Sequence, residues 1–194
     1  MTDNRSTVVA EAMLADAVRV QHALPTDAVE RKRTPLCTGC LDYFPAALTA
    51  VAESAEATDI AYEDDLIAAL RDRDLVRLAH VAIGVLHVEL TGLLHGTASD
   101  DDFGLEALFR AFPQAMAAIA QVSWHGNEKH NPGQPLHHAR GKSMDHFDCI
   151  ARHYVERGGF DGPMRHSACL AWRALAALQE DLEAKGAPKA RGAK

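Results

Sequence analysis

Apolar residues recur every three or four positions along most of the chain, and no segment shows the strict alternation of a half-buried strand. Alanine is abundant and aromatic residues make up only 6 % of the chain, which favours helices over strands. We therefore predict an all-α protein folded as a helical bundle. The predicted helices cover residues 7–20, 45–56, 63–71, 75–94, 105–122, 143–157 and 163–184.

Three polar segments rich in glycine, proline or aspartate separate these helices, at residues 23–43, 95–104 and 125–142, and we predict them as loops. Phe44-Pro45 and Phe112-Pro113 each precede an alanine-rich apolar segment, with the proline where it would begin a helix. The parallel indicates either an internal duplication or a recurrence that follows from composition alone. The resulting division is an N-terminal helical half, 1–104, which the duplication would make a degenerate repeat, a C-terminal half, 105–185, that carries the site, and a disordered tail, 186–194.

Charge and composition narrow the classes of partner. The formal net charge of −7 argues against binding a nucleic acid duplex through its phosphates, but it allows a local cationic pocket for one small anion. The chain contains neither a signal-peptide core nor a membrane-spanning run, so we expect a cytoplasmic protein that does not bind membranes. Its four cysteines are expected to be reduced thiols or metal ligands rather than disulfides.

The first candidate site is the polar segment 125–142, where four histidines lie among charged residues. Such a segment held on a helical scaffold is typical of a binding site, because its side chains can converge on a ligand. The alternative is a solvated connection between helices. The candidate residues of this segment are Asn127, Glu128, Lys129, His130, Asn131, Arg140 and Lys142.

The following predicted helix places Asp145, Asp148, Cys149 and Arg152 on one face, at spacings of three, four and seven. Two carboxylates one turn apart can share a magnesium ion, which prefers oxygen ligands and accompanies triphosphate substrates. The alternative is a surface ion pair between Asp148 and Arg152, with Asp145 at the helix N-terminus.

A third group of candidates follows in Arg152-His153, Asp161 and Arg165-His166. Arg165 and His166 lie near a predicted helix N-terminus, where backbone N–H groups favour an anion such as phosphate. Structural explanations are also open, since Asp161 precedes Gly-Pro as a turn residue does and His166 is equally typical of a buried histidine.

Two weaker patterns involve cysteine and histidine. Cys37 and Cys40 have the spacing of half a zinc site without a second pair. His80 and His87 lie seven residues apart near Glu89, which suits either a metal-binding face or a polar seam between packed helices.

Several of these motifs together resemble the phage and bacterial dATP/dGTP diphosphohydrolase family. The resemblance covers residues 31–54 and 123–183 and is carried by Arg33-Thr-Pro-Leu36, Asp42-Tyr-Phe-Pro45, Gly126-Asn-Glu-Lys-His-Asn-Pro-Gly133, Arg140-Gly-Lys-Ser143, Asp145-His146, Asp148-Cys-Ile150, Arg152-His153, Asp161, Arg165-His166 and Ala171-Trp-Arg-Ala-Leu175. It implies a relation to MazG-like all-α nucleotide pyrophosphohydrolases, with cleavage between the α- and β-phosphates, release of pyrophosphate, magnesium dependence and oligomers of helical bundles.

The leading hypothesis is a magnesium-dependent pyrophosphohydrolase that converts a purine deoxynucleoside triphosphate to the monophosphate. The spacing assigns magnesium to Glu128, Asp145 and Asp148, with Asp161 as a further ligand; Mn²⁺ is the alternative ion. Lys129 would act with these acids in catalysis. The substrate would be bound by Asn127, His130, Asn131, Arg140, Lys142, Arg152, His153, Arg165 and His166.

Two alternatives remain. One is a His/Asp-type phosphohydrolase with a transition metal on His130, Asp145, His146, His153 and His166. The other is a helical nucleotide-binding module without turnover. In each case we expect a homo-oligomer, because the apolar stripes of residues 75–94 and 163–182 are wider than a short bundle needs.

Overall fold

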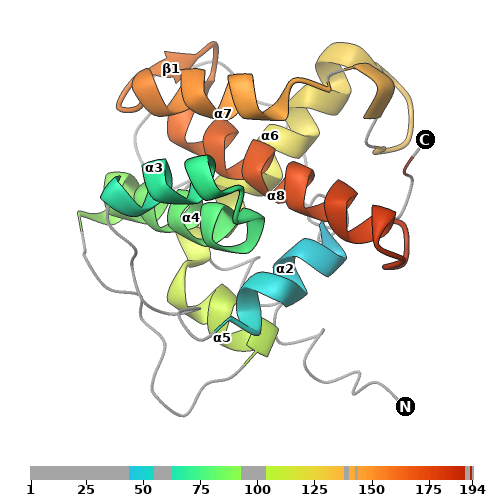
Figure 1. Cartoon of the computed structure of the whole chain (residues 1–194). Coiled ribbons are helices and arrows are strands. Elements are labelled where there is room, and N and C mark those ends of the chain that lie inside the picture. Colours follow the sequence, from blue (N-terminus) through green and yellow to red (C-terminus); the bar gives the residue numbers. More distant parts are fainter. Residues whose placement is uncertain are drawn as a thin grey trace.

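The computed structural model describes residues 44–54, 63–92, 104–137, 140–142, 144–190 and 193. Its helices are α2 (Pro45–Ala52), α3 (Glu63–Asp72), α4 (Leu75–Thr91), α5 (Gly104–Ala111), α6 (Pro113–His130), the 3-10 turn η2 (Arg140–Lys142), α7 (His146–Val155) and α8 (His166–Ala184) (Figure 1). A two-stranded antiparallel hairpin, β1 (Phe160–Asp161) and β2 (Met164–Arg165), links α7 to α8. The predicted all-α fold is confirmed. The predicted helix 7–20 and the Cys37/Cys40 pair lie outside the described residues.

Proline sets two of the helix starts, as the sequence predicts. Pro45 and Pro113 occupy the first turns of α2 and α6, where the missing N–H needs no intrahelical partner. Pro113 also divides the predicted helix 105–122 into α5 and α6. α6 then continues to His130, so residues 125–130 are helical and the prediction of a loop there is wrong. The reason is that the first proline after Pro113 is Pro132, just beyond the end of α6.

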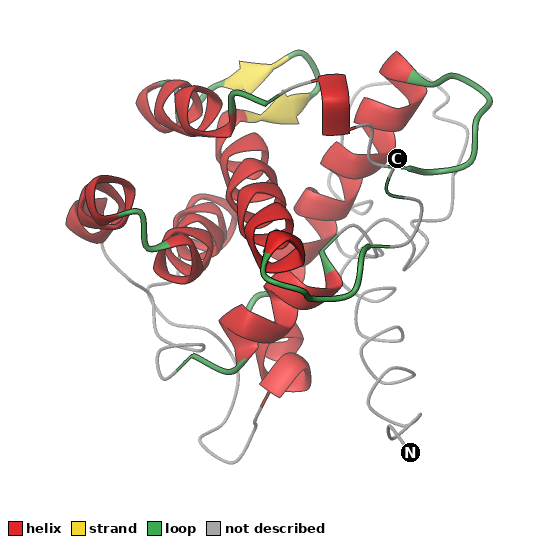
Figure 2. Ribbon diagram, turned by 45° about the vertical axis from the view of Figure 1, so that its right-hand side comes forward, coloured by secondary structure: helices red, strands yellow, loops and turns green. Residues whose placement is uncertain are grey.

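Helix α8 lies at the centre of the molecule. It packs against α2, α4, α6 and α7 (Figure 2), and its buried residues include Leu170, Ala174, Leu175 and Leu178. α4 is likewise covered, by α2, α3, α6 and α8. The wide apolar stripes that motivated the expectation of an oligomer are therefore covered, in the described residues, by helices of the same chain. Helices from both predicted halves share one core.

A buried glutamine of α8 caps helix α2. Phe44, at the N-cap position, makes no side-chain cap hydrogen bond. Instead Gln179 Oε1 accepts hydrogen bonds from the backbone N–H groups of Ala46 at 2.9 Å and Ala47 at 3.0 Å. Because Pro45 has no N–H, these two groups are the free donors that follow it in the first turn. Gln179 is fully buried, so α8 both packs α2 and satisfies its N-terminus.

The chain folds back after α8. The backbone N–H of Ala187 donates to Leu182 O at 3.0 Å, and that of Ala190 donates to Glu183 Oε1 at 2.8 Å. Ala190 is buried. Residues 186–190 thus pack against the end of α8, which differs from the disorder expected for the tail.

No helix in the described part of the chain is both long and apolar enough to cross a bilayer.

Candidate metal centre

The hairpin between α7 and α8 reverses the direction of the chain. Gly158 has a φ of 85°, which favours glycine. A Cβ on Gly159 would lie 3.3 Å from the carbonyl oxygen of Glu156 and 3.6 Å from the His166 ring. The backbone N–H of His166 donates to Gly159 O at 3.1 Å. The small residues of this turn therefore bring the start of α8 against the end of α7.

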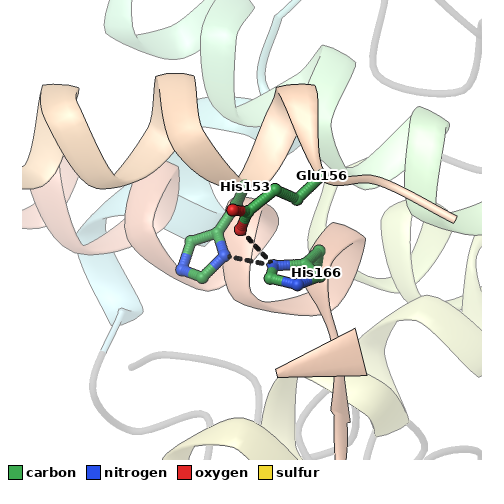
Figure 3. A group of neighbouring side chains, drawn as sticks. All are labelled: His153, Glu156 and His166. Atoms are coloured by element: carbon green, nitrogen blue, oxygen red, sulfur yellow. Dashed lines mark hydrogen bonds and ion pairs between the residues drawn. The ribbon is translucent and has the colours of Figure 1, made fainter. Parts of the chain in front are cut away.

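Three side chains that can bind a metal converge at this junction. His153 and Glu156 come from the end of α7 and His166 from the start of α8 (Figure 3). The Nδ1 atoms of the two histidines are 2.9 Å apart, and His166 Nδ1 is 3.3 Å from Glu156 Oε2. One ligand atom from each residue lies within 4.8 Å of the others, and no other group of this kind occurs among the described residues.

The two histidines are buried while the carboxylate is open to solvent. His153 is 3 % exposed and His166 is 9 % exposed, whereas Glu156 is exposed. Burial, and after it the positive charge of Arg152, lower the pKa of His153 to about 4, with Asp161 acting in the opposite sense. His153 is therefore neutral at pH 7, which is the form of imidazole that binds a metal ion.

The structure brings together four residues that the sequence singles out: Arg152, His153, Asp161 and His166. Arg152 Nη1 is 3.4 Å from Glu156 Oε2, and its Nη2 is 3.4 Å from His153 Nε2. Asp161 is exposed on β1 and acts electrostatically on His153. An exposed guanidinium thus lies directly beside the three converging ligands, an arrangement suited to an anion bound next to a metal ion.

Other predicted residues lie apart from this group. Asp145 and Asp148 are exposed at the N-terminal end of α7, and Glu128, Lys129 and His130 are exposed in the last turn of α6. Glu128, Asp145, Asp148 and Asp161 do not form a set of three converging ligand atoms in the part of the chain that the structure describes. Asn131 ends α6, its backbone N–H bonded to Asn127 O at 2.7 Å. The side chain of Lys142 lies outside the described part.

Three predicted substrate-binding residues make structural contacts instead. Asn127 is buried, donating to Gln134 O at 3.1 Å and accepting from the backbone N–H of His137 at 3.4 Å. Arg140 forms a two-pronged ion pair with Glu183, with Nη2 to Oε1 at 2.6 Å. Arg165 pairs with Glu89 on α4 at 2.6 Å. These side chains hold loops and helices together.

The remaining histidine and cysteine candidates are also engaged in packing. His80 and His87 are buried on α4 against the ring of Phe112, with centroids 6.5 and 5.2 Å away. His146 Nε2 lies 3.3 Å from Glu180 Oε2 on α8. Cys149 and Cys169 are free thiols, and burial raises the pKa of Cys169 to about 11. The Cys169 thiol therefore stays protonated at neutral pH.

The Arg140–Glu183 pair leads to a prediction for acid stability. The hydrogen bonds from Arg140, and then those from Gln179 and Ala190, hold the pKa of Glu183 at about 2, below its ordinary 4.5. A lowered carboxyl pKa stabilises the fold above pH 4.5, and this contribution is lost as the pH falls towards 2. Urea unfolding of the protein and of Glu183→Gln should show their stability difference shrinking by about 3 kcal/mol between neutral pH and about pH 2. A difference that is constant with pH would contradict the charged pair.

Glu156, the third converging ligand, is not among the site residues predicted from the sequence. Its signal was the spacing His153-x-x-Glu156, which places both side chains near each other on a helix. That signal gains meaning only when His166, ten residues further on, is folded back against it. Arg173 on α8, whose charge also lowers the pKa of His153, was likewise not identified.

Comparisons with known proteins do not assign this centre. The chain matches no model of a protein family, no curated protein and no solved structure.

Proposed function

We propose that this protein hydrolyses a purine deoxynucleoside triphosphate to the monophosphate and pyrophosphate, with a divalent metal ion as cofactor. The observation that carries the proposal is the convergence of His153, Glu156 and His166 beside the guanidinium of Arg152. All four lie within residues 123–183, the longer of the two segments whose motifs resemble dATP/dGTP diphosphohydrolases. The substrate class and the position of cleavage come from that resemblance.

The chemistry required is the addition of a water oxygen to the α-phosphorus. The bond from that phosphorus to the bridging oxygen breaks, pyrophosphate leaves with the bonding electrons, and the water proton passes to solvent. A divalent ion at the centre would stabilise the negative charge that develops on the phosphate oxygens. Arg152, exposed and beside the centre, would bind the same oxygens with two N–H groups.

A turnover screen tests the proposal. Purified protein freed of metal by chelation is incubated with each deoxynucleoside triphosphate and with Mg²⁺, Mn²⁺ or Zn²⁺, and the phosphate products are separated. We expect pyrophosphate and the nucleoside monophosphate from dATP or dGTP, and no product without metal. Release of tripolyphosphate would shift the assignment to the His/Asp-type reaction. Absence of turnover with every nucleotide and ion would refute the proposal.

Replacing Arg152 by alanine should weaken substrate binding more than it affects the fold. A charge-assisted hydrogen bond to phosphate contributes about 1.5 to 3 kcal/mol, so we expect KM for the nucleotide to rise roughly 10- to 100-fold. Arg152→Lys should restore part of the loss, because it keeps the charge without the fork of N–H donors.

The matched control for this change is Arg71→Ala. Arg71 lies on α3, is exposed, and its guanidinium pairs with the neighbouring Asp72. Its removal should leave KM unchanged. Equal KM values for Arg152→Ala and the unmodified protein would show that Arg152 does not contact the substrate.

A further inference from the structure

We infer that His153, Glu156 and His166 form a site for a transition-metal dication of the zinc class, and that this site excludes magnesium. The inference deepens the proposed function by naming the ion of the same centre, and it rests on that proposal only for what the ion does. It departs from the magnesium expected from the carboxylates of α7. Three features of the described residues carry it: the donor atoms, their spacing and their exposure.

The donor atoms are two imidazole nitrogens and one carboxylate oxygen. Nitrogen donors suit zinc, iron, cobalt, nickel and copper, whereas magnesium takes oxygen ligands and gives up its water reluctantly. A set of two histidines and one carboxylate is found at catalytic zinc and non-haem iron sites. The chemistry of the ligands therefore selects the class of metal before any geometry is considered.

Two of the three separations between ligand atoms match those around one ion, and all three lie within 4.8 Å. Bonds of about 2.0 to 2.1 Å to a zinc-class ion place neighbouring ligand atoms about 2.9 Å apart at right angles and about 3.4 Å apart at the tetrahedral angle. The observed separations are 2.9 Å between the two Nδ1 atoms and 3.3 Å between His166 Nδ1 and Glu156 Oε2. A small approach of the side chains around an ion would thus complete the site.

At the same spacing, the close contact of the two Nδ1 atoms is satisfied either by one shared proton or by one shared ion. A neutral imidazole carries one N–H, so two Nδ1 atoms in contact need a proton on one of them and a lone pair on the other. An ion between them accepts a lone pair from each, and it accepts the Glu156 carboxylate as well. Figure 3 shows the three side chains turned towards this common point.

The exposure of the ligands makes the site open on one side. The imidazoles of His153 and His166 are buried, and Glu156 and the neighbouring Arg152 are exposed. Three protein ligands leave at least one coordination position for water or for a phosphate oxygen, which is typical of catalytic rather than structural zinc sites. The ion would therefore be reached from solvent past Glu156.

The test is metal binding by the full chain without nucleotide. Protein freed of metal is titrated with Zn²⁺ by calorimetry and with Co²⁺ by visible absorption, and Mg²⁺ is then added in excess. We expect one ion per chain, a cobalt spectrum of four or five ligands, and no displacement by a roughly thousand-fold excess of Mg²⁺. Zn²⁺ should also raise the melting temperature, by roughly 5 to 10 °C at about a hundred times Kd.

The ligand assignment is tested by Glu156→Gln, which should raise Kd for Zn²⁺ about 100-fold or more. Its matched control is Glu53→Gln, because Glu53 is likewise an exposed glutamate at the C-cap of a helix, here α2. The control should bind Zn²⁺ as the unmodified protein does. If the first variant does not fold, imidazole ¹⁵N spectra of the unmodified protein replace it, and two of the eleven histidines should change on Zn²⁺ addition.

Two results would overturn the inference: no uptake of Zn²⁺ or Co²⁺, or uptake that Glu156→Gln leaves unchanged. They are separable from failure of the proposed function. Tight zinc binding without nucleotide turnover would retain the metal site and refute the hydrolase. Turnover with Mg²⁺ alone, in protein that binds no zinc, would retain the hydrolase and refute the zinc-class site.

Discussion

Replacing Glu156 by glutamine is expected to reduce nucleotide turnover by roughly 10²- to 10³-fold while leaving the protein folded. The expectation follows from the proposed function. Glu156 is the one charged ligand of the three, and it neutralises part of the charge of the bound ion. Because Glu156 is exposed, the substitution should change the free energy of unfolding little. The buried side chain that it contacts is His166, at 3.3 Å. Turnover at saturating metal and circular dichroism are the two measurements.

The informative comparison is with Asp148→Asn. Asp148 is an exposed carboxylate on the same helix, two turns earlier, and the sequence pattern assigned it to magnesium. Asp148 belongs to the magnesium ligands predicted from the sequence, and Glu156 belongs to the group that the structure brings together. In the structure Arg152 pairs with Glu156. A larger loss of turnover for Glu156→Gln supports the centre at His153, Glu156 and His166. A larger loss for Asp148→Asn would return the site to the carboxylates, with Glu53→Gln as the unaffected control for both.

Helical periodicity and proline predicted the fold well for physical reasons. A buried stripe must recur every three or four residues, and Pro45 and Pro113 can begin helices but cannot continue them. The ends of helices were predicted less well. α6 extends to His130 although its last turns are polar, because a solvated helical turn needs no apolar residues, and the sequence pattern does not distinguish it from a loop.

The candidate site was predicted in parts. Arg152, His153, Asp161 and His166 were each identified, but the carboxylate that completes the group was not. Convergence of His153 and His166 depends on a turn whose Gly158 and Gly159 allow a close approach. This contact is a feature of the tertiary structure, and no periodic pattern in the sequence indicates it. Conversely, Arg140 and Arg165 look like phosphate ligands in the sequence, because only the fold reveals that Glu183 and Glu89 neutralise them.

The width of the apolar stripes shows the same limit. Residues 75–94 and 163–182 are apolar on more than one face, which suggested a second copy of the chain. In the described part of the structure α4 packs against α2, α3, α6 and α8, and α8 packs against α2, α4, α6 and α7. A central helix and an interface helix have the same sequence pattern, because both are buried on several sides. The pattern alone therefore does not decide the oligomeric state.

Replacing Gln179 by leucine is expected to lower the free energy of unfolding by roughly 3 to 5 kcal/mol. Gln179 Oε1 accepts from the N–H groups of Ala46 and Ala47, and its Nε2 donates to Glu183 Oε1 at 2.8 Å. Leucine has a similar volume but no polar atoms, so two N–H groups at the start of α2 would lose their partner. Each buried donor left unsatisfied costs about 1 to 3 kcal/mol, and Glu183 would lose a donor as well. Urea unfolding at neutral pH measures the loss.

The size of this loss decides whether Gln179 acts as the cap of α2 or only fills space in the core. If it fills space, leucine should be neutral or stabilising, since it buries more apolar surface at the same position. If it is the cap, the loss should lie in the range given above, because both N–H groups and Glu183 lose a partner. Gln114→Leu, at a half-buried glutamine in the first turn of α6, is the control and should change stability by no more than about 0.5 kcal/mol. Equal stabilities of Gln179→Leu and this control would show that Gln179 does not stabilise α2 as a cap. The packing of Ala47, Leu48 and Val51 would then hold α2 against α8.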